Sequence, residues 1–132
     1  TAHLAQHERR LSKLDALAEE ALDPRRHGPD DAETLLVCWG STAGPAAEAV
    51  DRINADGGSA AMLHFTQVWP LRPDRIASAL GEPRRIVCVE GNATGQFAAL
   101  LRQEGLCREA TLLPRYDGLP LTAEYIIERL GA

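Results

Sequence analysis

The fold is decided by one stretch of the chain, Ile86-Val87-Cys88-Val89-Glu90-Gly91-Asn92-Ala93-Thr94-Gly95-Gln96. An apolar run of strand length ends in an acid and breaks at a glycine. It then enters Gln96-Phe97-Ala98-Ala99-Leu100-Leu101, which is typical of a helix. In a parallel sheet, such a strand-to-helix turn lies at the carboxyl edge, where ligands and partners bind. We therefore expect an α/β domain whose functional loops lie at this edge.

The same alternation continues on both sides of this stretch. We predict strands at residues 34–39, 59–65, 85–90 and 109–113, with a helix after each one. Strands that alternate with helices form right-handed crossovers, which predicts a short, mostly parallel sheet in a three-layer α/β/α domain. Covering both faces requires one reversal of winding. The predicted strand order is 2-1-3-4, with the reversal between the loops Gly40–Gly44 and Glu90–Gly95.

Two segments precede the predicted α/β domain, which spans residues 34–132. Residues 1–22 form a helical extension with apolar residues at heptad spacing over about three heptads. This stripe indicates packing either on its own domain or on another domain or subunit, and the pattern favours neither. Residues 23–33 are polar and rich in Pro and Asp, which predicts a linker. The stripe comprises Leu4, Leu11 and Ala18 at one heptad position and His7, Leu14 and Ala21 at another.

Composition excludes several classes of protein. A length of 132 residues indicates one domain, and a net charge of −5 disfavours nonspecific binding to nucleic acid or to an acidic membrane. No apolar run is long enough to span a bilayer, and the amino-terminal stretch does not resemble a signal peptide. The absence of an initial Met suggests a piece of a longer chain. Cys38, Cys88 and Cys107 show no metal-site spacing, which predicts buried thiols in a reducing cytoplasm.

The two loops at the reversal point are candidates for ligand binding. The loop Gly40-Ser41-Thr42-Ala43-Gly44 could hold an anion on its backbone N–H groups, but it matches neither dinucleotide nor P-loop fingerprints. A tight turn with Ser41 or Thr42 as helix cap is the favoured interpretation.

Glu90 could act as a general base, or its carboxylate could accept hydrogen bonds from loop N–H groups near Asn92 and Thr94. No partner acid, histidine or nucleophile can be named beside it, so the structural role is favoured. Gly95 is predicted to allow a close approach of the backbone. Two further loops, Trp69-Pro70 and Tyr116-Asp117-Gly118, carry aromatic residues of the kind that anchor protein interfaces.

Four motifs in register together resemble a known family. They are the Gly-Ser-Thr turn at 40–42, Trp69-Pro70, the stretch Glu90–Gln96 and Tyr116-Asp117-Gly118. This combination resembles the carboxyl-terminal domain of 2-oxoacid:ferredoxin oxidoreductase α subunits, most of all the 2-oxoglutarate type, over nearly the whole chain.

The resemblance implies the fold of the transketolase carboxyl-terminal domain. That fold has an additional antiparallel edge strand where this chain has its polar linker, so we expect this strand to be absent. The family pattern Glu-Asn-Asn reads Glu90-Gly91-Asn92 here, and Gly91 removes one hydrogen-bonding side chain.

The activity implied by this resemblance belongs to a complex. Such complexes oxidatively decarboxylate a 2-oxoacid to an acyl-CoA and reduce ferredoxin, with thiamine diphosphate, magnesium and iron–sulfur clusters held mainly by another subunit or domain. This chain has neither a Gly-Asp-Gly motif followed by Asn nor cluster cysteines. We therefore expect it to hold no cofactor, metal ligand or catalytic residue. The resemblance makes five residues candidates for a structured interface loop: Glu90, Asn92, Thr94, Gly95 and Gln96.

Two functions follow from these observations. The first is a noncatalytic assembly domain that docks on the remainder of an α subunit and on a thiamine-diphosphate-binding β subunit, and that as an isolated fragment could form a homodimer. The alternative is a free-standing α/β domain that binds a phosphate-bearing ligand in the crevice between Gly40 and Glu90. An independent enzyme is the weakest interpretation, because no nucleophile and base can be paired.

Overall fold

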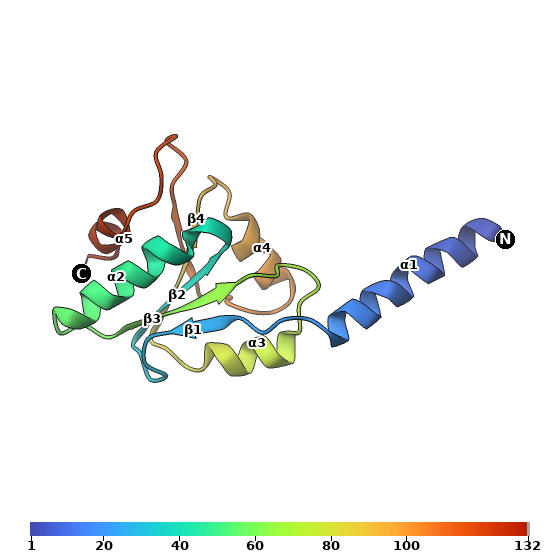
Figure 1. The fold of residues 1–132 in the computed structure, drawn as a ribbon, viewed down its shortest axis with the longest axis horizontal. Helices are drawn as coiled ribbons and strands as arrows, with labels where there is room; N and C mark the ends of the chain where they lie inside the picture. The colour runs from blue at the N-terminus through green and yellow to red at the C-terminus, as the bar shows by residue number, and fades with distance from the viewer. Residues whose placement is uncertain (132) are drawn as a thin grey trace.

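The computed structural model describes residues 1–131. A five-stranded sheet lies between two pairs of helices, and the first helix projects away from this body (Figure 1). The elements in chain order are α1 (Ala2–Glu19), β1 (Arg25–His27), β2 (Thr34–Trp39), the 3-10 turn η1 (Gly40–Thr42), α2 (Ala43–Ala55), β3 (Ala60–Phe65), α3 (Pro73–Leu80), β4 (Arg85–Glu90), α4 (Gln96–Gln103), β5 (Thr111–Pro114) and α5 (Ala123–Leu130).

The strand order is β1-β3-β2-β4-β5. The last four strands are parallel and follow the predicted order 2-1-3-4, which confirms the predicted topology. Thr34 pairs with both Ala60 and Arg85, so the three central strands begin together. Their carboxyl ends therefore meet at one edge of the sheet, and the loops that follow β2 and β4 become neighbours.

Each face of the sheet has its own apolar core. Successive side chains of a strand point to opposite faces, so the continuous apolar run of β2 supplies both cores at once. One core lies under α3 and α4, and the other lies under α2 and α5. The predicted three layers are thereby confirmed. The helix residues buried in the first core include Ile76, Leu80, Phe97, Ala98 and Leu101, and those in the second include Ala46, Ala49, Val50, Ile53, Ala123, Ile126 and Leu130.

The three cysteines lie in these cores. Cys38 belongs to the core under α2 and α5, whereas Cys88 and Cys107 belong to the core under α3 and α4. All three are free and buried, as the sequence predicts. Burial raises the pKa of the Cys38 thiol to about 11, because the apolar surroundings disfavour a thiolate.

The predicted linker contains a strand. Residues Arg25–His27 form β1 and pair antiparallel with β3, so the expectation that the edge strand is absent is wrong. The strand is short and polar, and no alternation of apolar residues marks it. Gly28 provides the missing signal: its φ of +101° turns the chain, and a Cβ there would lie 2.9 Å from the Ala60 carbonyl oxygen. Only glycine fits this close approach to β3.

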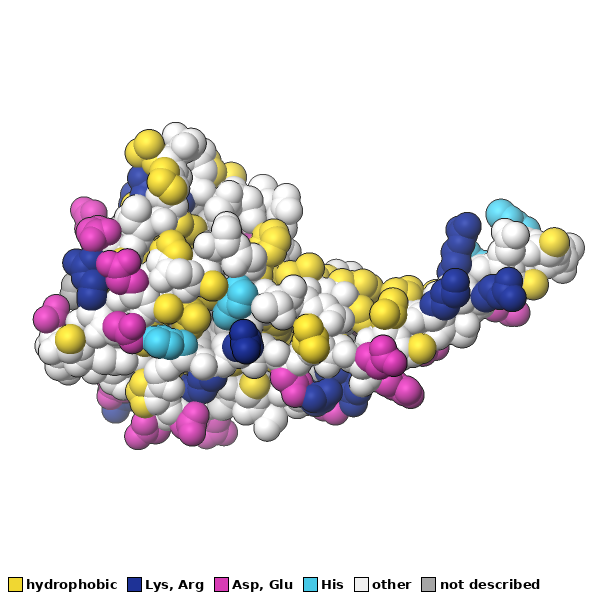
Figure 2. All heavy atoms as spheres, in the orientation of Figure 1, with side chains coloured by type: hydrophobic (Ala, Val, Ile, Leu, Met, Phe, Trp, Pro, Cys, Tyr) yellow, Lys and Arg dark blue, Asp and Glu magenta, His cyan; other side chains and the backbone are white. Residues whose placement is uncertain are grey.

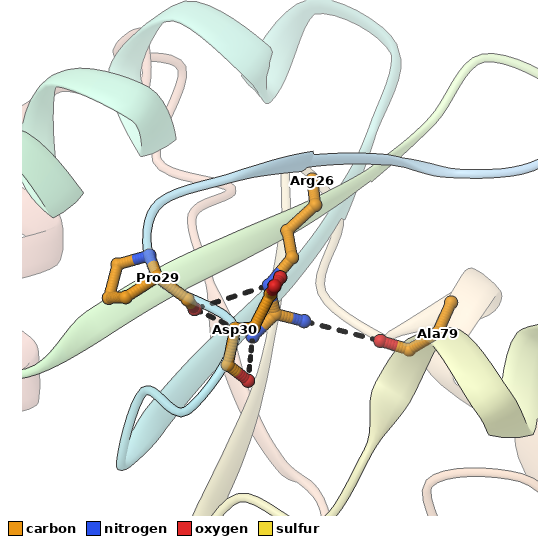
Figure 3. Close-up of polar contacts among 4 residues, drawn as sticks. All are labelled: Arg26, Pro29, Asp30 and Ala79. Atoms are coloured by element: carbon orange, nitrogen blue, oxygen red, sulfur yellow. Dashed lines mark hydrogen bonds and ion pairs between the residues drawn. The ribbon is translucent and has the colours of Figure 1, made fainter.

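Arg26 fixes β1 to the rest of the domain, as Figure 3 shows. Its Nη1 donates to the Ala79 carbonyl oxygen of α3 at 3.2 Å. Its Nη2 donates to the carbonyl oxygens of Pro29 and Asp30 at 2.9 and 3.0 Å. One guanidinium thus closes the turn after β1 and joins this turn to the last residues of α3.

Helix α1 projects from the domain, and none of its residues is buried (Figure 1). Its carboxyl end is attached by two hydrogen bonds. The Leu22 N–H donates to the Gln67 side chain at 3.1 Å, and Arg72 donates to the Ala18 carbonyl oxygen at 3.4 Å. The heptad stripe packs on its own domain at its carboxyl end, where Ala21 is buried and Ala18 half-buried, whereas Leu4, Leu11 and Leu14 are exposed. Within residues 1–131, no helix has both the length and the apolar composition needed to cross a membrane.

Candidate functional site

The predicted crevice exists at the carboxyl edge, between the loops that follow β2 and β4. A hollow of about 270 Å³ is lined by Trp39, Gly40, Ser41, Thr42, Gly91, Asn92 and Gln96. A second hollow of about 420 Å³ shares Ser41, Thr42 and Gly91 with it, and extends toward Arg115 and residues 119–121. The parallel register of β2 and β4 brings these two loops together.

Glu90 bonds to two residues that line the smaller hollow, Trp39 and Asn92, and is itself completely buried. Its carboxylate accepts the backbone N–H groups of Phe97 and Ala98, at 2.8 and 3.0 Å, in the first turn of α4. It also accepts the Trp39 indole N–H at 3.2 Å and the Asn92 side-chain amide at 3.1 Å. A negative charge at a helix amino terminus is favourable, because the unpaired N–H groups there carry partial positive charge. The arrangement is that of a buried helix cap.

The backbone donors to Glu90 differ from those that the sequence suggests. They lie seven and eight residues further along the chain, in α4, whereas the predicted loop contributes the side-chain amide of Asn92. Every contact of the carboxylate is a donor that stabilises its charge, and none is a histidine or a nucleophile. Glu90 is also completely buried, which separates its carboxylate from a substrate at the surface. The geometry therefore supports a structural role.

The rest of the loop is shaped by Asn92 and Gly95. The Asn92 side-chain oxygen accepts the Gln96 N–H at 3.1 Å, which ties the two ends of the turn together. Gly95 has a φ of +63°, and a Cβ there would lie 2.8 Å from the methyl groups of Leu112. This agrees with the predicted close approach. Thr94 and Gln96 are exposed, and a Cβ on Gly91 would meet no atom within 4 Å.

Thr42 occupies the N-cap position of α2, as the sequence predicts, but its side chain makes no capping hydrogen bond to the helix. The Thr42 hydroxyl donates to the Trp39 carbonyl oxygen at 2.7 Å, and no side chain caps the first turn of α2. Ser41 is exposed and borders both hollows. The Gly40 carbonyl oxygen lies 2.9 Å from the His64 ring nitrogen, so this histidine bonds to the loop.

The two aromatic loops lie at opposite ends of the sheet. The loop of Trp69 and Pro70 follows β3, whereas that of Tyr116 follows β5, and β2 and β4 separate these strands. The structure therefore does not join them into one surface. Trp69 is 50% exposed and Tyr116 is 69% exposed, as suits residues that contact a partner.

The turn that follows Tyr116 is held by its own polar contacts. The Asp117 carboxylate accepts the Leu119 N–H at 3.0 Å and the Arg115 Nε–H at 3.1 Å. These bonds lower the pKa of Asp117. Gly118, between the two bonded residues, has a φ of +83°.

Exposed apolar residues form a further surface, which we term the apolar arm. Figure 2 shows hydrophobic side chains along α1 that continue onto the body of the domain at its base. Gln67 connects the two parts, because its side chain bonds both to Leu22 and to the carbonyl oxygen of Trp69. The heptad pattern indicates part of this surface, but Leu17 and Leu22 lie outside the predicted stripe. The arm comprises Leu4, Leu11, Leu14, Leu17, Leu22 and Trp69.

Comparison with known proteins adds independent observations. Residues 25–106 match the family model described as "Transketolase, C-terminal domain". The chain is 32% identical over 130 residues to the α subunit of 2-oxoacid:ferredoxin oxidoreductase 1 from Aeropyrum pernix, covering 95% of this chain and 20% of that subunit. It is 25% identical over 100 residues to 2-oxoglutarate synthase subunit KorA from Methanothermobacter marburgensis, covering 76% of this chain and 27% of that subunit. The chain thus spans about a fifth of the length of the Aeropyrum pernix relative.

Solved structures share the fold. One is 2-oxoglutarate:ferredoxin oxidoreductase from Magnetococcus marinus with 2-oxoglutarate, coenzyme A and succinyl-CoA bound. It matches with a TM-score of 0.85 and 24% identity, over 98% of this chain and 23% of that chain. A split-gene transketolase, in an inactive β4 tetramer, matches with a TM-score of 0.59 and 16% identity, over 81% of this chain and 40% of that chain. At these identities the likeness concerns the fold alone.

Proposed function

The chain belongs to the family of transketolase C-terminal domains, and on this premise we propose that it is a noncatalytic assembly domain of a 2-oxoacid:ferredoxin oxidoreductase α subunit. The complex would oxidatively decarboxylate a 2-oxoacid to an acyl-CoA and reduce ferredoxin. The domain would dock on the remainder of the α subunit and on a thiamine-diphosphate-binding β subunit. The similarity to α subunits over 95% of the chain supports this assignment.

The observation that carries the proposal is the apolar arm. An 18-residue helix with no buried residue presents leucines to solvent, of which Leu4, Leu11 and Leu17 are more than half exposed. Contiguous exposed apolar surface of this kind marks a protein interaction site. Its continuation onto Trp69 gives the partner one surface formed by both the helix and the domain. The chain also spans only a fifth of its Aeropyrum pernix relative, which leaves most of such a subunit to cover the arm.

The crevice supports a role without catalysis. The carboxylate of Glu90 is buried and accepts hydrogen bonds from four donors, of which two are N–H groups of the first turn of α4. Within residues 1–131, no three His, Cys, Asp or Glu side chains come together as a group that could hold a metal ion. We assign thiamine diphosphate, magnesium and the clusters to the partner domains, with coenzyme A as a substrate of the complex.

We further propose 2-oxoglutarate as the 2-oxoacid. The similarity to a 2-oxoglutarate synthase subunit supports this choice. A ketoisovalerate oxidoreductase subunit from Methanothermobacter thermautotrophicus is similarly related, at 28% identity, and provides the competing substrate. The reconstituted complex should therefore reduce ferredoxin faster with 2-oxoglutarate than with 2-oxoisovalerate or pyruvate. A preference for either of the other acids would refute the assignment of 2-oxoglutarate as the substrate, but it would not refute the assembly role.

A docking experiment tests the proposal. The 132-residue chain and the remainder of the α subunit are produced separately, and their association is measured by calorimetry with and without the β subunit. Leu11→Glu places a charge in the apolar arm, and Ala16→Glu adds the same charge on the opposite side of α1. A buried leucine contributes about 1.5–3 kcal/mol, so Leu11→Glu should weaken association by at least tenfold. Ala16→Glu should bind like the unaltered chain.

Two outcomes would contradict the assembly role. One is the absence of association with both partners while the chain retains its helical circular dichroism. The other is equal weakening by Leu11→Glu and Ala16→Glu, which would show that the leucines make no interface. Sedimentation of the chain alone shows whether the arm instead forms a homodimer.

The two hollows at the crevice favour a second candidate function. They adjoin the amino-terminal loop of α2 and measure about 270 and 420 Å³, the size of a small-ligand site. A phosphate-bearing ligand could bind there, on the exposed Ser41 and the backbone of Gly40. Calorimetry against thiamine diphosphate, coenzyme A and common nucleotides separates this function from assembly. Absence of heat from all of them would reject it.

A further inference from the structure

A groove lies at the outer edge of the sheet, between β5 and α5. Its volume is about 500 Å³, larger than either hollow at the crevice, and it falls within the range of small-ligand sites. Its floor includes Val87 and Leu113, and the Thr111 side chain is exposed within it. The remaining lining residues are Arg85, Leu112, Pro114, Tyr116, Asp117, Tyr125 and Arg129.

Two arginines line this groove, and a hydrogen bond to the fold orients one of them. Arg85 Nη1 donates to the Leu130 carbonyl oxygen at 3.0 Å. The Arg129 guanidinium lies 5.2 Å from the centre of the Tyr125 ring. That ring is itself fixed, because its hydroxyl donates to the Pro114 carbonyl oxygen at 2.9 Å. The bond to Leu130 orients Arg85, so this guanidinium loses less freedom on binding. The planar set of donors of both arginines matches the oxygens of a phosphate.

The local charge is positive although the chain carries a net charge of −5. Asp117 is the acid that lines the groove, and its carboxylate is bonded to Arg115 and to the Leu119 N–H. Within residues 1–131, neither Arg85 nor Arg129 forms an ion pair. No carboxylate among these residues therefore competes with an anionic ligand for either guanidinium group.

The edge of β5 is poorly suited to an added strand, which argues against an extended polypeptide as the ligand. In a parallel strand, the backbone N–H and C=O groups of every second residue bond to one neighbouring strand, and those of the residues between them point to the other side. The Arg115 N–H bonds to the Glu90 carbonyl oxygen, so Leu112 and Pro114 face outward. Pro114 has no N–H, and Tyr125 already occupies its carbonyl oxygen. Only the backbone groups of Leu112 remain to bond an incoming strand. One residue offers too few hydrogen bonds for β-strand addition.

We propose that this groove binds a small phosphate-bearing ligand, whose phosphate oxygens accept hydrogen bonds from Arg85 and Arg129. Thr111 supplies a further hydroxyl, and the apolar floor accommodates the carbon part of the ligand. The site is separate from the crevice and from the apolar arm, so it does not depend on the assembly role.

Titration of the 132-residue chain tests this site. Inorganic pyrophosphate and ADP are added separately, and binding is followed by the backbone amide resonances of the ¹⁵N-labelled chain. The amides of residues 111–113 and the Nε–H groups of Arg85 and Arg129 should shift. Arg129→Gln should weaken binding of either probe about tenfold, because one charge-assisted hydrogen bond is lost. The neighbouring Arg84→Gln is the matched control and should change affinity less than twofold.

Each outcome is decisive because the Arg129 side chain makes no hydrogen bond or ion pair within residues 1–131, so its substitution removes from the fold only the contact with the Tyr125 ring. Loss of Arg85 also removes a bond to α5, and Arg85→Gln is therefore checked by circular dichroism first. The proposal is overturned if millimolar pyrophosphate and ADP shift no amide of the groove. It is equally overturned if Arg84→Gln weakens binding as much as Arg129→Gln, or if a Glu-rich peptide binds while both phosphates fail. Tighter binding of ADP than of pyrophosphate assigns the site to an organic phosphate, and the reverse order assigns it to a free phosphate.

Discussion

Replacement of Glu90 by glutamine keeps the shape of the side chain and removes its charge. If the carboxylate caps α4, this change should destabilise the domain. If Glu90 instead were a catalytic base, the change would abolish a reaction and leave stability nearly unchanged. The two roles therefore differ in what the substitution does to the free energy of unfolding.

The size of the effect follows from the donors around the carboxylate. Oε1 accepts from Trp39, Asn92 and Phe97, whereas Oε2 accepts from the Ala98 N–H. A glutamine carbonyl oxygen in the place of Oε1 can still accept the three hydrogen bonds from Trp39, Asn92 and Phe97. The glutamine NH₂ group then faces the Ala98 N–H, so that two donors oppose each other and that bond is lost. The lost charge-assisted bond costs about 1.5–3 kcal/mol. Loss of the charge at the helix terminus adds about 0.5–1 kcal/mol, so we expect a total of about 3 kcal/mol.

Urea unfolding measures this loss. For a domain of this size the slope of stability against urea is about 2 kcal/mol per molar, so the midpoint should fall by about 1.5 M. Circular dichroism follows the helices, and tryptophan fluorescence reports on Trp39, which bonds to Glu90. Glu109→Gln removes an exposed carboxylate and serves as the control. An unchanged midpoint for Glu90→Gln would refute the capping role.

Three further predictions follow from the loops and the edge of the sheet. Gly95→Ala should cost about 2 kcal/mol of unfolding free energy, because an L residue is strained at a φ of +63°. Gly91→Asn lies in open space and should change the unfolding free energy by less than about 0.5 kcal/mol. Equal effects of the two substitutions in urea unfolding would contradict both assignments. Arg26→Gln should increase hydrogen exchange at the amides of β1, since its bonds to Pro29, Asp30 and Ala79 close that turn; unchanged protection would show that pairing with β3 suffices. The pKa of Glu124 lies below its ordinary 4.5, because its own backbone N–H and Arg52 stabilise the carboxylate. The ionised Glu124 carboxylate therefore stabilises the fold above pH 4.5, and this stabilisation is lost as the pH falls through the lower pKa of the folded state. The difference in urea midpoint between the unaltered chain and Glu124→Gln should therefore disappear on acidification.

The sequence by itself determined the four parallel strands of the sheet and their order. Apolar runs bounded by glycine and proline are local signals, and they predict β2 and β4 with the bounds that the structure has. The order 2-1-3-4 follows from these runs, because right-handed crossovers and coverage of both faces leave few arrangements. The four motifs at 40–42, 69–70, 90–96 and 116–118 together indicated the family that residues 25–106 match.

Only the tertiary structure decided what depends on contacts between distant residues. Strand β1 is polar and three residues long, and it becomes a strand only through pairing with β3. The role of Glu90 depends on Trp39, 51 positions earlier in the chain, and on N–H groups that become available where α4 begins. The groove at β5 combines Arg85 of β4 with Tyr125 and Arg129 of α5.

The helix α1 shows the same division within one element. Its heptad pattern is local and predicts a helix, but a stripe of leucines has the same sequence whether it packs on its own domain or faces solvent. The fold left every residue of α1 unburied, because the sheet was already covered on both faces by α2, α3, α4 and α5. Periodicity therefore predicts that a face is apolar, whereas the packing of the whole chain decides whether that face remains for a partner.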